Sequence, residues 1–203
     1  MPTRFLPAVM ASLRAFVAVP APPEEPLVAL LEELGSLDAD LRPVAPGHLH
    51  FTLSFLGEVP AGAVSELALG MAEAARGVPA FRARLRGVGA FPSARRPRVV
   101  WVGLDDPRPM VALATRMREA LAARGHPGDD KDLRAHLTLA RVKVPRGEAS
   151  RSVRGAEEIG SFLKRHGADM AGEFDVREVV LYESVLSPQG PEYEALATAP
   201  LEG

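Results

Sequence analysis

Two histidines in this chain are each followed, two positions later, by a threonine. The first pair is His50 with Thr52, and the second pair is His136 with Thr138. On a β-strand, residues two apart point to the same face, so each histidine would project beside its threonine. One His-x-Thr string carries almost no information, but two copies at matching points of a repeated element order predict a shared site.

Such a pair of histidines suits phosphodiester hydrolysis. Imidazole titrates near neutral pH, so one ring can be neutral while the other is protonated. The neutral ring would take a proton from water, and the protonated ring would deliver one to the departing ribose oxygen. The threonine hydroxyls would donate hydrogen bonds to the non-bridging oxygens, where negative charge develops in the transition state.

Arg141 could add a charge-assisted contact to the phosphate. It follows Thr138 by three positions, so strict alternation places it on the opposite face of the strand. Arg141 can therefore serve the same site only if the strand ends or bulges there.

Two other interpretations of the histidines stay open at this stage. In the first, His48, His50 and His136 bind zinc. The sequence places no aspartate or glutamate close to either motif to complete such a site, and the threonines would have no role. In the second, both histidines are ordinary half-buried strand residues. Their matching positions in the two halves of the chain argue against that.

The composition is that of a folded protein. The chain has 203 residues, 47% of them hydrophobic and 25% charged, which allows one large domain or two small lobes. No apolar run approaches the length of a membrane span, and residues 1–13 lack the features of a signal peptide. We therefore expect a soluble, cytoplasmic protein with no membrane association. The absence of cysteine excludes disulfides, thiolate catalysis and cysteine-based metal sites.

The formal net charge of −2 means that no global basic field attracts nucleic acid. Any RNA contact must come from a local patch. Arg82, Arg84 and Arg86 alternate along one predicted strand, and we interpret them as a solvated strand face.

The predicted elements repeat their order once along the chain. Strands are expected at 14–20, 50–56 and 81–91 around helices at 22–34 and 63–76, and then at 98–104, 134–142 and 173–186 around helices at 107–124 and 156–166. His50 follows Phe16 by 34 positions, and His136 follows Trp101 by 35. This spacing indicates an internal duplication with halves of roughly 1–92 and 93–203.

We expect residues 1–203 to form a single bilobal domain with strands exchanged between its lobes and a ligand cleft between them. The polar segment 125–133, which contains two glycines, is expected to be a loop at this cleft.

The chain resembles the 2H phosphoesterase superfamily, and within it the bacterial and archaeal RNA 2′,3′-cyclic phosphodiesterases once described as 2′-5′ RNA ligases. The core of the resemblance is the pair of His-x-Thr-Leu strings at 50–53 and 136–139. It extends to residues 14–19, 96–103 and 181–193. Ala135 departs from the pattern, because this family often has proline before the second histidine.

The resemblance implies an α+β fold with duplicated strand-helix-strand-helix-strand halves and antiparallel sheets that line a central cleft. It implies that a terminal 2′,3′-cyclic phosphate is converted to a 2′-phosphate without a metal or other cofactor. The substrate would be an RNA end or a small cyclic nucleotide, and a monomer is the simplest expectation.

The same resemblance assigns roles to single residues. His50 would protonate the leaving 3′-oxygen, and His136 would activate water. Arg141 would bind the phosphate together with both threonines, and Phe55 would border the cleft as a contact for the base.

Two alternative functions use the same groups. One is 2′-5′ RNA ligation, which is the reverse chemistry. The other is a nucleotide- or RNA-binding module without turnover, which we would expect to have lost one motif. Both motifs are complete here.

Overall fold

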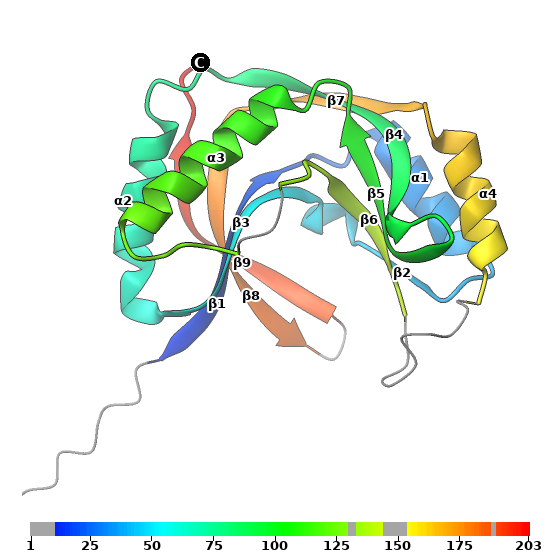
Figure 1. The fold of residues 1–203 in the computed structure, drawn as a ribbon, viewed down its shortest axis with the longest axis horizontal. Helices are drawn as coiled ribbons and strands as arrows, with labels where there is room; N and C mark the ends of the chain where they lie inside the picture. Colours follow the sequence, from blue (N-terminus) through cyan, green and yellow to red (C-terminus); the bar gives the residue numbers. More distant parts are fainter. Residues whose placement is uncertain (1–10, 130–132, 144–153, 188–189) are drawn as a thin grey trace, which may run out of the picture.

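The computed structural model describes residues 11–129, 133–143, 154–187 and 190–203. They form a mixed α+β fold in which helices flank one antiparallel sheet (Figure 1). The strands are β1 (Ser12–Pro20), β2 (Leu41–Pro43), β3 (His50–Pro60), β4 (Phe81–Ser93), β5 (Arg96–Leu104), β6 (Leu137–Val142), β7 (Met170–Val176), β8 (Glu178–Ser187) and β9 (Gly190–Pro200). The helices are α1 (Glu25–Ser36), α2 (Val64–Ala75), α3 (Arg108–Ala123) and α4 (Ala156–His166), with short 3-10 turns η1 (Pro46–His48) and η2 (Ala61–Ala63).

The sheet curls into two walls that share one seam. Its strands follow the order β7-β4-β5-β6-β3-β1-β8-β9, and β2 pairs with β6. The seam is the contact between β3 and β6, where Phe51 is the register partner of Leu137. We call β3, β1, β8 and β9 the first-motif lobe, and β6, β5, β4, β7 and β2 the second-motif lobe. The expected α+β fold is confirmed, with the sheets of its two lobes joined into one.

The two halves of the sequence are interleaved in this sheet. β4 comes from the first half and pairs with β5, whereas β8 comes from the second half and pairs with β1. The helices cross over in the same way, since α1 packs on β6 and β7 while α3 packs on β3. Each lobe is therefore built from both halves.

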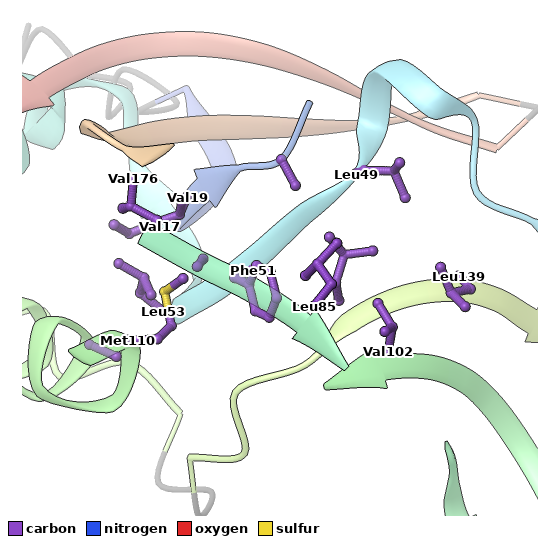
Figure 2. Packing of buried hydrophobic residues seen from close by; sticks show 14 of the residues in the cluster. Val17, Val19, Leu49, Phe51, Leu53, Leu85, Val102, Met110, Leu139 and Val176 are labelled. Carbon is purple, nitrogen blue, oxygen red and sulfur yellow. The ribbon is translucent and has the colours of Figure 1, made fainter. Parts of the chain in front are cut away.

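The core lies between the sheet and the helices. In α1, the four leucines at positions 27, 30, 31 and 34 recur at helical spacing and are all buried. Phe51 and Leu53 of β3 point into the same core, and Figure 2 shows them near Leu85 and Met110. Burying a side chain of this size contributes about 1.5–3 kcal/mol to folding. Because these side chains are buried, the opposite face of β3 points away from the core, toward the open side of the sheet.

Three features of the fold differ from the sequence-based expectations. The strand expected at 173–186 is two strands, β7 and β8, because the chain crosses from one lobe to the other at Arg177. The short strand β2 and the C-terminal strand β9 were not expected. β6 begins at Leu137, so His136 lies just before the strand.

Part of the expected cleft loop, residues 130–132, lies outside the described residues, as do the first ten residues of the segment compared with a signal peptide. Among the helices that the structure describes, none is both long and apolar enough to cross a membrane.

Candidate active site

A cleft of about 1290 Å³ lies between the two lobes and brings the predicted site residues together. Its walls come mainly from β1, β2, β3 and β6, from residues 125–129, and from the end of β8 and the start of β9. All six residues predicted from the sequence line it: His50, Thr52, Phe55, His136, Thr138 and Arg141.

A bulge in β6 turns Arg141 into this cleft. Thr138 is the register partner of Trp101, but Ala140 is the partner of Val100, so Leu139 is an extra residue in the ladder. A bulge of this kind reverses the alternation of the residues that follow it. Arg141 therefore shares the face of Thr138, which removes the objection from strict alternation.

The first motif contains the same irregularity. Thr52 is the register partner of Ala18 and Ser54 is the partner of Val17, so Leu53 is the extra residue of β3. As a result Ser54 is fully buried, and Phe55 is 43% exposed on the cleft side. Phe55 thus occupies the place in the first motif that Arg141 occupies in the second.

Each bulged residue has its carbonyl oxygen bound by a group outside the strand ladder. Arg118 of α3 donates from Nε to the oxygen of Leu53 at 2.8 Å. The backbone N–H of Val44 donates to the oxygen of Leu139, also at 2.8 Å. These contacts hold the bulges in place. The sequence carries no signal for Arg118, because a helical arginine is ordinarily read as solvated.

The loop after α3 completes the support of the first bulge. The N–H of Asp129 donates to the carbonyl oxygen of Phe55 at 2.9 Å. Gly128 lies so close to β3 that a Cβ there would fall 2.9 Å from the same oxygen and 2.3 Å from the Ser54 hydroxyl oxygen. Only glycine fits this approach of loop to strand.

Both histidine rings are held by the backbone in the same way. Nδ1 of His50 donates to the carbonyl oxygen of His48 at 2.7 Å. Nδ1 of His136 donates to the carbonyl oxygen of Arg134 at 2.6 Å. A carbonyl oxygen only accepts hydrogen bonds, so Nδ1 carries the hydrogen in each ring. The other nitrogen, Nε2, is then the one that exchanges protons with a ligand.

Aromatic side chains pack against both rings. The ring centroid of His50 lies 5.1 Å from that of Phe16 and 5.3 Å from that of Tyr193, which is perpendicular to it. His136 has one such neighbour, Phe91, at 4.9 Å and also nearly perpendicular. Edge-to-face packing of this kind restrains each ring and removes water from one side of it.

This environment lowers the pKa of both histidines. Burial is the largest cause for His50, whose pKa falls to about 4 from its usual 6.5, and the positive charge of Arg141 adds to the effect. Burial also lowers the pKa of His136, again with Arg141 as a contributor. An anion bound beside Arg141 would offset its charge and raise both pKa values.

The described residues do not form a metal site. Among them, no three histidine, cysteine, aspartate or glutamate side chains converge closely enough to hold an ion. The ring of His48 instead lies 5.0 Å from that of Tyr193. The three-histidine zinc interpretation therefore has no support in the arrangement of these side chains.

Comparison with known proteins places this chain in one class, the LigT-like phosphoesterases. Residues 17–101 match the family model described as "LigT like Phosphoesterase". The RNA 2′,3′-cyclic phosphodiesterase of Archaeoglobus fulgidus is 34% identical over 186 residues, which cover 91% of this chain and 98% of that protein. The chain belongs to this family.

Solved structures agree with that assignment. The crystal structure of a Thermus thermophilus protein matches with a TM-score of 0.73 and 32% identity, over 94% of this chain and 99% of that one. The crystal structure of E. coli LigT complexed with 3′-AMP matches with a TM-score of 0.70 and 26% identity, over 95% of this chain and 100% of the other.

Proposed function

We propose that this protein hydrolyses a terminal 2′,3′-cyclic phosphate of RNA to a 2′-phosphate, by acid–base catalysis with two histidines and no metal. The observation that carries the proposal is the pair of His–Thr strands on one cleft, with both imidazoles held through Nδ1 so that Nε2 is available. The names of the curated relatives and the nucleotide in the E. coli LigT structure support the same substrate class.

The reaction needs one proton on the histidine pair. His136 accepts a proton from water at Nε2 while the water oxygen forms a bond to phosphorus. The bond between phosphorus and the 3′-oxygen breaks, and His50 delivers its Nε2 proton to that oxygen. The two rings have matching backbone contacts, which do not distinguish the acid from the base. The assignment of His50 as the acid therefore follows the family resemblance.

The remaining groups act on the phosphate and the base. The hydroxyls of Thr52 and Thr138 donate to the two non-bridging oxygens, where charge develops as water attacks. Arg141 supplies a charge-assisted contact to the same oxygens. Phe55 offers an exposed ring at the cleft wall on which the terminal base can stack.

The test is to incubate the purified protein, in EDTA, with a short RNA that ends in a 2′,3′-cyclic phosphate. The product is then analysed for the position of its phosphate. We expect turnover to a 2′-phosphate at an unchanged rate in EDTA. A 3′-phosphate product would contradict the departing oxygen assigned here, and activity lost in EDTA but restored by zinc would contradict metal independence.

A further inference from the structure

We propose that Arg42, beside Arg141, forms a second phosphate subsite, which binds a phosphodiester of the RNA chain on the 5′ side of the reacting nucleotide. This inference rests on the proposed function. It would let the protein favour an RNA end over a mononucleotide with the same cyclic phosphate.

The first observation is a pair of like charges. Arg42 of β2 and Arg141 of β6 are direct register partners, so their side chains leave the sheet on the same face. Both are exposed, and both line the cleft. Two cations placed opposite each other in a sheet destabilise it, and a bound anion relieves that repulsion.

The second observation is that nothing in the described part of the chain neutralises these two side chains. Arg82 and Arg84 pair with Glu173, and Arg86 pairs with Asp105, so the alternating arginines of β4 are neutralised by their neighbours. By contrast, neither Arg42 nor Arg141 forms an ion pair with a described carboxylate. Arg42 and Arg141 are thus two neighbouring cations at the cleft without a carboxylate partner among the described residues.

Arg141 and Arg42 differ in how closely they approach the histidines. Arg141 is close enough for its charge to lower the pKa of both rings, and Arg42 is not among the charges that lower either pKa. Arg141 therefore serves the reacting centre. Arg42 is then positioned for the next phosphate.

The backbone around Arg42 is held firmly. Leu41 is buried, and the N–H of Val44 is bound to the bulged residue Leu139. The guanidinium reaches toward the opposite lobe, since a Cβ added at Gly190 would lie 3.6 Å from Nη1 of Arg42. A planar guanidinium in this place suits bidentate binding of a phosphodiester that leaves the mouth of the cleft.

Arg14 is the other cleft-lining arginine that could guide the RNA chain. It lies on β1 at the other side of the cleft, where its register partner is Glu58. An opposed carboxylate offsets its charge and would repel a phosphate. The observations therefore favour an RNA path past Arg42.

The experiment compares two substrates, a 2′,3′-cyclic mononucleotide and a four-nucleotide RNA with the same cyclic end. We expect Arg42→Gln to lower kcat/KM for the RNA about tenfold while kcat/KM for the mononucleotide stays within about twofold. The slope of log kcat/KM against log salt, measured on the RNA, should become shallower by about 0.7, as for the loss of one phosphate contact on a single strand. Two control variants should leave kcat/KM unchanged for both substrates. They are Arg14→Gln and Arg108→Gln, and Arg108 is remote from the cleft and paired with Asp106.

Several outcomes would overturn the inference. Equal losses on both substrates would show that Arg42 acts on the reacting centre, and unchanged kinetics on both would show that it binds nothing. A loss of kcat/KM for the RNA in Arg14→Gln alone would place the RNA chain on the Arg14 side of the cleft. Arg42→Lys guards against misfolding, because it keeps the charge and should retain most of the preference for RNA. If the wild-type protein turned over neither substrate, the proposed function would fail and the subsite with it.

Discussion

At the scale of single residues, the site consists of two matching units. His50 and His136 each bond through Nδ1 to the carbonyl two residues earlier, each stands beside a threonine, and each packs against an aromatic ring. The units differ in the number of aromatic neighbours and in the residue three positions after the threonine, which is an aromatic in one and a cation in the other. We infer that one phosphate lies between two similar proton-transfer groups, with the base on one side and the added charge on the other.

The histidines should matter more than the threonines. Loss of an acid or a base typically costs about 10²- to 10⁴-fold, so His50→Ala and His136→Ala should each lower kcat at least 100-fold. A hydrogen bond to a charged group contributes about 1.5–3 kcal/mol, so Thr52→Ala and Thr138→Ala should cost about 10- to 100-fold. Single-turnover rates on the cyclic-ended RNA measure both effects. Near-native turnover in either histidine variant would refute the paired mechanism.

The pH dependence of kcat/KM and of kcat should reflect the lowered pKa values of the two histidines. In the free protein one proton resides on the pair only at acidic pH, since the pKa of His50 is about 4 and that of His136 is also lowered. The optimum of kcat/KM should therefore lie below pH 6.5, with a fall as pH rises. A bound phosphate anion favours the protonated rings, so the alkaline limb of kcat should lie at higher pH than that of kcat/KM.

Arg141→Gln provides the control for this explanation. Removing a positive neighbour favours the protonated imidazoles, so the alkaline limb of kcat/KM should move to higher pH even as the rate falls. A shift to lower pH in this variant, or coincident alkaline limbs in the wild-type profiles of kcat and kcat/KM, would contradict the electrostatic account.

At the scale of elements, the two bulges decide which side chains reach the cleft. Alternation along a strand predicted the placement of His50, Thr52, His136 and Thr138, because these residues precede the extra residue in each strand. It could not place Arg141, since nothing in the string Thr-Leu-Ala-Arg distinguishes a bulge from a regular strand. Leu139 and Ala140 are adjacent and both buried, but a regular strand buried on both faces has the same pattern.

Arg118 should act as a positioning residue for the first bulge. Arg118→Met removes both the donor to the Leu53 oxygen and the ion pair with Asp129, but it keeps the apolar stem. The bulge that orients Thr52 and Phe55 should therefore loosen. An unpaired buried carbonyl costs about 1–3 kcal/mol. We expect kcat to fall about tenfold at a temperature well below Tm, with partial recovery in Arg118→Lys.

Arg116 of the same helix offers a matched comparison for Arg118. It donates to the backbone oxygens of Ala74 and Arg76 at the end of α2, and it does not line the cleft. Arg116→Met should lower Tm by a similar amount without changing kcat. Equal effects of the two variants on kcat would show that Arg118 contributes only to stability.

The elements that sequence patterns missed are those defined by their partners. β2 has three residues and is a strand only because it pairs with β6, and its pairing is what brings Arg42 opposite Arg141. The division of residues 173–186 at Arg177 also follows from tertiary structure, since β7 pairs with β4 while β8 pairs with β1 and β9. The alternation of buried and exposed residues breaks at Arg177 and Glu178, which are both exposed. A bulge within one strand gives the same break, so the pattern alone does not predict the crossing.

At the scale of the whole molecule, interleaving of the halves joins the two lobes. The repeat of element order was visible in the spacing of the motifs, but the exchange of β4 and β8 places each half of the chain in both lobes. The cleft therefore has walls that neither half can build alone. We propose on this basis that the chain folds as one unit.

Cutting the chain in the turn between β4 and β5, after Ala94, tests this proposal. Fragment 1–94 would lack β5 and β7 beside β4, and β6 and β7 against α1. Fragment 95–203 would lack β1 beside β8 and β3 against α3. Each fragment would expose large apolar surfaces, so each alone should show the circular dichroism and amide exchange of an unfolded chain. The turn is exposed, so the mixed fragments should reassemble and recover cyclic phosphodiesterase activity. A folded fragment 1–94 with protected strand amides would instead mean that each half is an independent domain, and the cleft would then be an interface between two domains.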